Sequence, residues 1–261
     1  MQRKLIFPDL DAVPSDFRSL FIGSSVYDSS CSPAAKVYFI DKDNGYYLKS
    51  APKGALKTEA ELTAYFYKKH LATEVLSYIS AEKDWMLTQR VCGEDCTHAA
   101  YLEDPEKLCD TIAELLRALH EADHTDCPVQ NRIESYFATA ERSYREKLYD
   151  ASQFPDSFGY ASAQEAWKVV EKYGHLLKAD TLLHGDYCLP NIMLDKWRFS
   201  GFIDLGNSGV GDKHIDIFWG IWSLWFNLKT DRFQERFMDA YGRSAIEPEM
   251  LKVIAAFEVF G

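Results

Sequence analysis

The chain has 261 residues, of which 47% are hydrophobic and 26% are charged, and its formal net charge is −11. This composition is typical of a soluble globular protein with one large domain or two lobes. No apolar run is long enough to span a membrane. The negative charge argues against nucleic acid or an anionic membrane as a partner and suits a cationic ligand. The first residues lack the apolar run of a signal peptide, so we expect a cytoplasmic protein, a monomer or a weak dimer.

The first ninety residues predict mostly strands and turns. Two β-rich runs, residues 36–40 and 46–49, flank Asn44-Gly45, a pair typical of a hairpin turn. Residues 58–71 have the apolar spacing of a helix, and residues 75–91 predict two more strands around a polar turn. This part of the chain therefore predicts a small α+β lobe.

The character of the sequence changes after residue 92. Asp104 and Pro105 are typical of the N-cap and first turn of a helix, and an apolar stripe at helical spacing follows them. Further helices are predicted at residues 131–150, at residues 162–177 and from about Asp216 onward, with short β-rich segments at residues 181–186, 192–195 and 199–204.

We therefore predict two lobes, residues 1–92 and residues 93–261. The first would be rich in strands and the second larger and mainly helical. A cleft between two lobes is a common place for a ligand site.

Residues 184–191 read HGDYCLPN and set Asp186 and Asn191 at a fixed spacing. An Asp followed, after four residues, by an Asn is the spacing of a kinase catalytic loop. In that loop the Asp carboxylate accepts the proton of the acceptor hydroxyl, and the Asn binds a divalent metal. Read alone, the same residues could equally form another metal site or an ordinary turn, because Asp and Asn favour turns.

Three further positions match the needs of phosphoryl transfer. Asp204, in the stretch FIDLG, stands where a main metal ligand would follow a strand. Lys49 lies in a predicted strand, and Glu61, with Glu59 as second choice, lies in the helix that follows. Each could separately be a turn or surface residue, but their joint order favours a kinase-like site.

These segments resemble the aminoglycoside phosphotransferases, especially the 3′-phosphotransferase group. The resemblance rests on HGDYCLPNIMLD, SGFIDLGNSGVGDKHIDI, SPAAKVYFI and YYLK, and it extends over nearly the whole chain. It implies an α+β fold of two lobes similar to the protein kinases. It also implies transfer of the γ-phosphoryl group of ATP or GTP, with Mg²⁺, to the 3′-hydroxyl of an aminoglycoside, which confers resistance to the drug.

The resemblance also implies a role for individual residues. Asp186 would orient or deprotonate the acceptor hydroxyl, and Asn191 and Asp204 would bind Mg²⁺. Tyr47 would stack on the adenine of the nucleotide, and the backbone of Gln89 and Val91 would contact the edge of the base. Ser32 would lie in the loop that covers the phosphates. Lys49, held by Glu61, would contact the α- and β-phosphates.

Three residues near the catalytic loop have alternative interpretations. His184 would either hold the loop or act as a general base; the first is favoured because Asp186 occupies the catalytic position. Asp216 is expected to bond the loop backbone, and His120 to be a packing residue with its polar atoms satisfied.

The family lines its acceptor pocket with carboxylates that pair with ammonium groups. Glu258 and Asp156 are the matching acids here. Trp225 and Phe226 stand where an acid is expected and would either pack in a helix or line the pocket, and Asn207 replaces the usual Arg after the I-D-x-G stretch. These departures leave two rival hypotheses: a kinase for another small hydroxyl compound, such as another antibiotic or an amino alcohol, and a catalytically weak binding protein of kinase fold.

Overall fold

The structure is a computed structural model that describes residues 4–150 and 159–261. Its internal contacts divide the chain into two compact units, Met1–Asp95 with Met193–Gly206, and Cys96–Ile192 with Asn207–Gly261. The predicted single boundary at residue 92 omitted the return of residues 193–206 to the first unit. This return follows from the pairing of β9 (Ile192–Asp195) with β7 (Glu94–Asp95). The pairing joins segments that are distant in the sequence, so no local sequence pattern predicts it.

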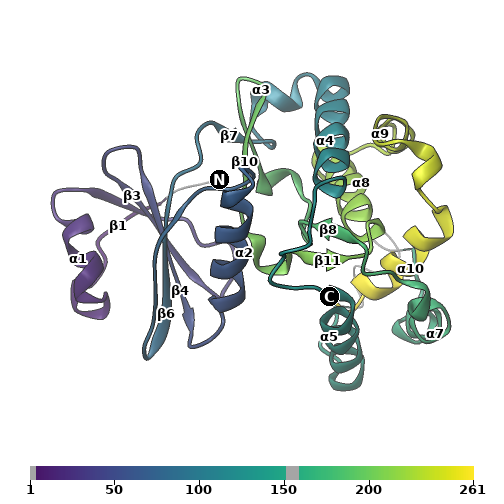
Figure 1. The fold of residues 1–261 in the computed structure, drawn as a ribbon, viewed down its shortest axis with the longest axis horizontal. Helices are drawn as coiled ribbons and strands as arrows, with labels where there is room; N and C mark the ends of the chain where they lie inside the picture. Colours follow the sequence, from purple (N-terminus) through teal and green to yellow (C-terminus); the bar gives the residue numbers. More distant parts are fainter. Residues whose placement is uncertain (1–3, 151–158) are drawn as a thin grey trace. The chain divides into compact units, whose positions relative to one another are not determined.

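The first unit is built on a six-stranded antiparallel sheet with the order β1-β2-β3-β4-β6-β5. The helices α1 (Ser15–Phe21) and α2 (Lys57–Lys68) cover opposite faces of this sheet (Figure 1). The strands are β1 (Lys4–Ile6), β2 (Ser25–Asp28), β3 (Lys36–Asp41), β4 (Tyr46–Pro52), β5 (Val75–Ser80) and β6 (Lys83–Gln89). The predicted hairpin, the helix that follows it and the next two strands are confirmed.

Helix α1 was not predicted. It has only seven residues and no side-chain hydrogen bond at its N-cap, so its local sequence carries little helix signal. Phe17 and Phe21, one helical turn apart, are buried against the sheet. Tertiary burial of these two rings, rather than local propensity, therefore stabilises the helix.

The alternation of side chains along β4 decides where Lys49 points. Leu48 is fully buried in the core beneath α1. Because successive side chains of a strand point to opposite faces, Tyr47 and Lys49 lie on the other face, which carries α2. Lys49 pairs in register with Met86 of β6, whose side chain packs with residues at the start of α2.

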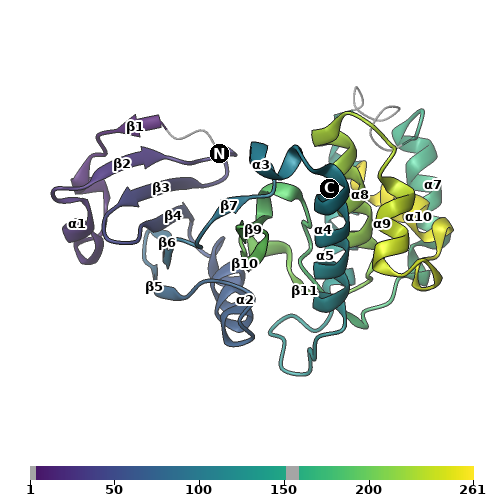
Figure 2. The ribbon, with the colours of Figure 1, turned by 90° about the horizontal axis from the view of Figure 1, so that it is seen from above.

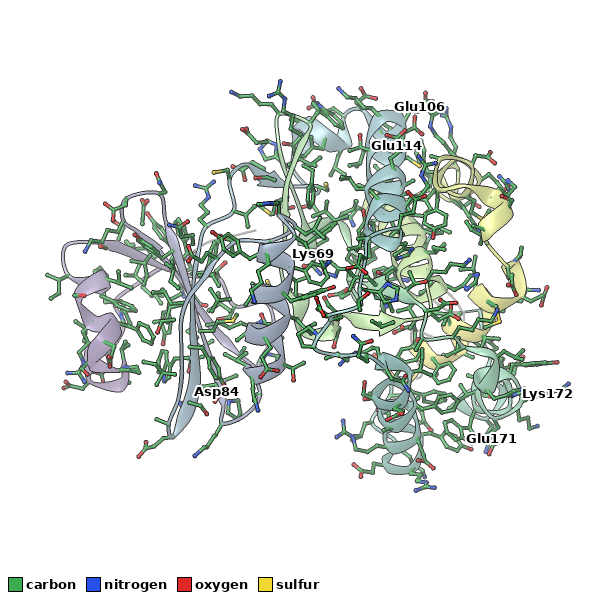
Figure 3. The ribbon with its side chains drawn as sticks, in the orientation of Figure 1. Lys69, Asp84, Glu106, Glu114, Glu171 and Lys172 are labelled. Atoms are coloured by element: carbon green, nitrogen blue, oxygen red, sulfur yellow. The ribbon has the colours of Figure 1, made fainter. Side chains whose placement is uncertain are left out.

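The carboxylate of Asp84 joins β6 to the start of α2. It accepts hydrogen bonds from the backbone N–H of Leu56 at 2.9 Å and from the hydroxyl of Ser80 at 2.7 Å, and it is fully buried. Figure 3 labels this residue on the sheet. The bonds at Asp84 offset its burial and set the position of α2 on the sheet that carries Lys49.

The second unit is mainly helical, as predicted, and contains a two-stranded ribbon. Its N-cap prediction is confirmed, since the Asp104 carboxylate accepts a hydrogen bond from the N–H of Lys107 at 3.3 Å. The elements are α3 (Ala99–Leu102), α4 (Pro105–His120), α5 (Arg132–Glu146), α7 (Ala163–Tyr173), α8 (His214–Leu228), α9 (Gln234–Tyr241) and α10 (Pro248–Glu258), with β8 (Thr181–Leu183) pairing antiparallel to β11 (Gly209–Gly211). The last predicted β-rich segment forms β10 (Arg198–Phe202), in the first unit.

Helices α5, α7 and α10 share one hydrophobic core. Phe257 of α10 stacks on Tyr136 of α5 with ring centroids 4.7 Å apart, and Tyr144 stacks on Trp167 at 4.6 Å. Figure 2 shows α8, α9 and α10 close together within this unit. The stacking of Phe257 fixes the end of α10 and so positions the next residue, Glu258. Within the described ranges, no helix combines the length and the apolar character needed to cross a bilayer.

Replacing Asp84 with Ala should destabilise the protein by roughly 2–3 kcal/mol, because the buried N–H of Leu56 would lose its acceptor. Urea unfolding measures this change. The exposed Glu82, two residues earlier, is the matched control, and its replacement by Ala should change stability by no more than about 0.5 kcal/mol. Equal effects of the two replacements would contradict the role given to Asp84.

Candidate active site

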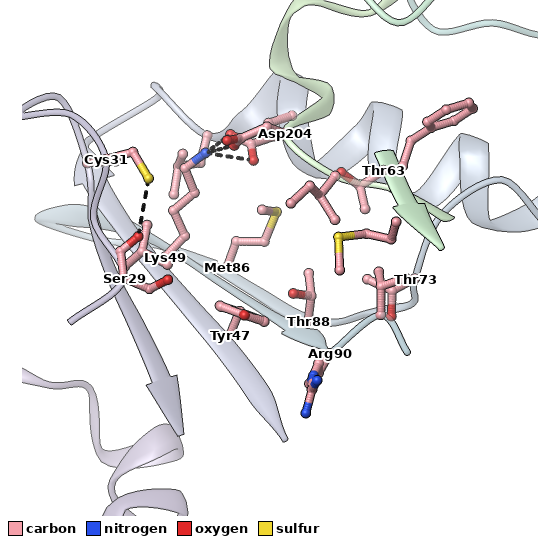
Figure 4. A pocket seen from close by; sticks show the side chains of 18 of the residues that line it. Ser29, Cys31, Tyr47, Lys49, Thr63, Thr73, Met86, Thr88, Arg90 and Asp204 are labelled. Carbon is pink, nitrogen blue, oxygen red and sulfur yellow. Dashed lines mark hydrogen bonds and ion pairs between the residues drawn. The ribbon is translucent and has the colours of Figure 1, made fainter. Parts of the chain in front are cut away.

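The side chain of Lys49 lies between two carboxylates of the first unit. Its ammonium nitrogen is 2.9 Å from both oxygens of Glu59 and 2.7 Å from Oδ1 of Asp204 (Figure 4). Burial by itself would lower the pKa of Lys49, but the charges of Asp204 and Glu59 outweigh it and raise the pKa. The lysine therefore stays charged, and the formal charges of the three side chains sum to −1.

The partner of Lys49 is Glu59, so the prediction of Glu61 was wrong. Residues two apart on a helix point about 200° apart, so only one of these acids can face the sheet. Glu59 is buried, whereas Glu61 is exposed and lies 4.0 Å from Lys57. The spacing of Glu59 from the buried Leu62 and Thr63, at three and four residues, was the sequence signal for the correct choice.

Asp204 follows β10 in a backbone conformation that is uncommon outside glycine. Its φ is +60°, in the left-handed region, where a residue with a Cβ is strained. The ion pair with Lys49 uses Oδ1, and the side chain remains 51% exposed. A strained, partly exposed acid beside a charged lysine suits a ligand-binding role better than a stabilising one.

A cavity of about 570 Å³ within the first unit adjoins the Lys49 cluster. It brings together the residues that were predicted to bind nucleotide: Ser32, Tyr47, Lys49, Gln89 and Val91. Glu61 is not among its lining residues, and Glu59 is.

Two of these residues show how a planar base could be held. The half-buried ring of Tyr47 lies against Phe39 with centroids 5.1 Å apart, which fixes its plane. The N–H of Gln89 donates to the carbonyl of Glu74 at 3.4 Å. The N–H of Val91 has no acceptor within residues 4–150 and 159–261, so it is the donor available at this edge of the cavity.

The loop that contains Ser32 is held at its base by Asp28. The Asp28 carboxylate accepts from the N–H of Ser30 at 3.0 Å and from its hydroxyl at 2.7 Å, and it pairs with Lys36. The Ser30 hydroxyl in turn accepts from the N–H of Val37 at 2.9 Å. The bonds to Lys36 and Ser30 lower the pKa of Asp28 to about 2, so the anchor remains ionised under all ordinary conditions.

Asp186 and Asn191 form a bonded pair in the second unit. The side-chain nitrogen of Asn191 donates to the carbonyl of Asp186 at 3.0 Å and to its Oδ2 at 2.9 Å. Both bonds use the amide nitrogen, so the amide oxygen of Asn191 remains as the atom that can bind a cation. The spacing seen in the sequence therefore folds into one loop with a fixed carboxylate.

The buried carboxylate of Asp216 bonds the backbone of this loop, as predicted. Asp216 accepts hydrogen bonds from the backbone N–H of His184 at 2.7 Å and of Gly185 at 2.8 Å. His120 lies 3.3 Å from the same carboxylate and bonds Tyr241 at 2.8 Å, which confirms that it is a satisfied packing residue.

The ring of His184 is fully buried, and its Nδ1 accepts from the N–H of Asp186 at 3.3 Å. A buried ring that already bonds the loop backbone is suited to hold the loop rather than to remove a proton from an acceptor. Gly185 has φ +83°, and a Cβ there would lie 1.9 Å from the carbonyl oxygen of Asn207. The turn between His184 and Asp186 therefore requires glycine.

A second cavity, of about 580 Å³, lies within the second unit and is lined by Asp186 and Glu258. Tyr136 donates its hydroxyl to Glu258 at 2.6 Å. Burial raises the pKa of Glu258 to about 7; the hydrogen bonds of Tyr136 and Trp219 oppose this shift, and the charge of Asp186 adds to it. Tyr136, Trp219 and Arg132 also line this cavity, and sequence reasoning missed all three.

One predicted substrate contact and two residues with alternative interpretations have other outcomes. Asp156 lies outside the described residues. Trp225 lines a different cavity, of about 800 Å³, together with Trp222. Phe226 stacks on Trp222 at 4.9 Å, and neither Trp225 nor Phe226 lines the cavity of Asp186. Phe226 thus packs against a ring of its own helix although 47% of it is exposed, and Trp225 faces a cavity other than that of Asp186.

The available donor atoms suit magnesium. No group of three His, Cys, Asp or Glu residues that could hold a metal occurs in the described ranges. Magnesium is usually bound by one or two protein oxygens together with substrate phosphates and water. The carboxylate of Asp204, in the first unit, and the amide oxygen of Asn191, in the second unit, are each a ligand atom of this kind.

Comparison with known proteins shows the family of the chain. A model of the phosphotransferase enzyme family matches residues 32–253. The chain belongs to this family. The phosphotransferase is 45% identical over 254 residues, 97% of each chain, to a protein of Lactococcus lactis subsp. lactis (strain IL1403) named "Probable aminoglycoside 3'-phosphotransferase".

Solved structures support the fold of this phosphotransferase. An aminoglycoside-3'-phosphotransferase of type VIII has a TM-score of 0.78 at 22% identity, over 97% of this chain and 99% of that one. An aminoglycoside phosphotransferase of Streptomyces rimosus, in complex with ADP and streptomycin, has a TM-score of 0.76 at 21% identity, over the same shares, 97% and 99%. The predicted α+β fold of the kinase-like type is thereby confirmed.

Replacing Glu59 with Gln should weaken the binding of ATP with Mg²⁺ about tenfold, because Lys49 would lose the acid that fixes its ammonium. Isothermal titration calorimetry measures this affinity. Replacing Glu61 with Gln is the matched control on the same helix and should leave the affinity within about twofold. A larger loss in the Glu61 variant would restore the pairing that the sequence first suggested.

Proposed function

We propose that this protein phosphorylates the 3′-hydroxyl of aminoglycosides with ATP or GTP and so confers resistance to them. The observation that carries the proposal is the Asp186 carboxylate, fixed by Asn191 in a cavity that also holds Glu258. A carboxylate that can receive a hydroxyl proton and a second acid beside it suit an acceptor with both hydroxyl and ammonium groups. The relative at 45% identity carries the name of this activity.

The nucleotide would bind in the cavity of the first unit. Tyr47 would stack on the base, and the backbone of Gln89 and Val91 would contact its edge. Lys49, held by Glu59, would contact the α- and β-phosphates, and the loop of Ser32 would cover them. The ion pairs of Lys49 with Glu59 and Asp204 support this arrangement. The Lys49 ammonium already binds two carboxylates, and phosphate oxygens can replace the exposed carboxylate of Asp204 as its partner.

Magnesium would be held by Asp204 and Asn191 and would neutralise charge on the β- and γ-phosphates. The residual negative charge of the Lys49, Glu59 and Asp204 cluster favours a divalent cation at Asp204. The amide oxygen of Asn191 is the atom left for the metal once the amide nitrogen has bonded Asp186.

The chemical step would be an in-line displacement at the γ-phosphorus. The acceptor oxygen forms the new P–O bond while the bond from the γ-phosphorus to the bridging oxygen breaks, and the nucleoside diphosphate leaves with that electron pair. The hydroxyl proton passes to the Asp186 carboxylate. Asn191 holds that carboxylate in place, so positioning supplies most of the rate enhancement.

The acceptor would be recognised by charge. Glu258, the exposed Asp150 and Asp186 line the same cavity, and ammonium groups would pair with carboxylates there. We place the reaction in the cytoplasm, where nucleoside triphosphates and magnesium are abundant.

Replacing Asp186 with Ala should lower kcat at least about 1,000-fold, because the carboxylate that orients the hydroxyl would be lost. A coupled assay of ADP release with kanamycin, neomycin, a macrolide and choline measures this loss and the acceptor class together. Replacing the exposed Asp195 with Ala is the control. Turnover of choline or the macrolide alone would contradict the aminoglycoside assignment, and an active Asp186→Ala variant would contradict the role of Asp186.

The KM for kanamycin should rise about tenfold as the pH falls from 8 to 6. Glu258 has a raised pKa of about 7, so its carboxylate is present above this pH and is lost by protonation below it. The amines of kanamycin become more fully protonated as the pH falls. This gain of positive charge would by itself lower the KM. A Glu258→Gln variant should show a high KM without the rise at low pH. A wild-type KM that falls on acidification would contradict the role of Glu258.

A further inference from the structure

Arg132 is the only basic residue among the described residues that line the cavity of Asp186. The other charged side chains there are the carboxylates of Asp150, Asp186 and Glu258. A guanidinium in a cavity that would receive a polycation repels that ligand. Its presence therefore calls for a reason other than acceptor affinity.

The guanidinium of Arg132 is held by an amide rather than by an acid. Its terminal nitrogen donates to Oδ1 of Asn207 at 2.7 Å. Among residues 4–150 and 159–261, no carboxylate lies within ion-pair distance of it. The side chain is half-buried, and burial lowers the pKa of Arg132, although a guanidinium stays charged at neutral pH.

Two costs are thus left without a bonded partner among the described residues. The charge is partly removed from water without a directly bonded carboxylate, and it stands at the first residue of α5, where the helix dipole is already positive. An anion that arrives during function would offset both. Four of the five N–H donors of a guanidinium remain after one donates to Asn207.

The position of Arg132 limits which anion this can be. Asn207, its partner, packs its carbonyl oxygen against Gly185, the residue before Asp186. Arg132, Asn207, Gly185 and Asp186 all line the one cavity. An anion at Arg132 would therefore lie at the catalytic-loop end of the cavity, where the hydroxyl accepts its phosphoryl group.

We propose that Arg132, oriented by Asn207, donates hydrogen bonds to the non-bridging oxygens of the phosphoryl group as it reaches the acceptor. This proposal rests on the proposed phosphotransferase function. Arg132 forms no covalent bond and moves no proton; it stabilises the negative charge that spreads over these oxygens during transfer. The acceptor carries no such charge, so the contact would act on kcat rather than on acceptor affinity.

The test compares Arg132→Gln with Arg142→Gln, an exposed arginine on the same helix. With kanamycin and ATP, Arg132→Gln should lower kcat roughly 100-fold, the low end for loss of one transition-state donor. The KM for ATP should stay within about threefold, and the KM for kanamycin should be unchanged or lower, because a repulsive charge is gone. Arg142→Gln should match the wild type.

Two further measurements separate a catalytic contact from a structural one. Aluminium fluoride with ADP, Mg²⁺ and kanamycin mimics the phosphoryl group in transfer; it should tighten ADP binding in the wild type but not in Arg132→Gln, while ADP alone binds both equally. Should Arg132→Gln fail to fold, Arg132→Lys keeps the charge without the planar fork and should lose about tenfold in kcat, as should Asn207→Ala.

The possible failures are distinguishable. If the wild type phosphorylates kanamycin and Arg132→Gln keeps kcat within about threefold, Arg132 does not contact the phosphoryl group. A loss that appears only in the KM for kanamycin would make Arg132 an acceptor contact and would also overturn the proposal. If the wild type phosphorylates no aminoglycoside, the proposed function fails and the assignment of Arg132 fails with it.

Discussion

One ammonium group shared by two carboxylates is the interaction on which the cavity of the first unit depends. Lys49 is largely buried, so it needs opposing charge, and Glu59 supplies it permanently from α2. Asp204 supplies a second, more exposed charge from the segment after β10. The cluster carries more negative than positive charge, which prepares it for a divalent cation. Sheet register, the bonds of Asp84 to α2 and the left-handed backbone of Asp204 all serve to bring these three groups together.

In the second unit, hydrogen bonds hold a short loop in place around one carboxylate, that of Asp186. Asp216 accepts two backbone hydrogen bonds below the loop, and Asn191 bonds Asp186 from within it. Gly185 permits the turn because no side chain fits against Asn207. The same Asn207 holds Arg132, so the Asp186 carboxylate and the one guanidinium of the described cavity lining are positioned by neighbouring parts of one loop system. Their opposite charges suit a hydroxyl that loses a proton and a phosphoryl group that carries negative charge.

The sequence predicted the parts of this site whose spacing is local. Asp186 with Asn191, Lys49 in its strand, and Asp204 before a glycine are short patterns with chemical meaning. The choice between Glu59 and Glu61 depends on which face of α2 meets the sheet, and the buried residues three and four positions on were the signal that was overlooked. The return of residues 193–206 to the first unit and the gathering of Tyr136, Trp219 and Arg132 around Asp186 come from tertiary contacts between distant segments. No local pattern contains that information.

The assignment as an aminoglycoside 3′-phosphotransferase joins these two arrangements into one reaction, and its product tests it most directly. Kanamycin incubated with the protein, ATP and Mg²⁺ would be purified and examined by ³¹P–¹H correlation NMR. We expect a single phosphomonoester whose phosphorus couples to the proton on carbon 3′, and no product from a 3′-deoxy analogue. A phosphate on another carbon, or ADP release without any phosphorylated kanamycin, would contradict it.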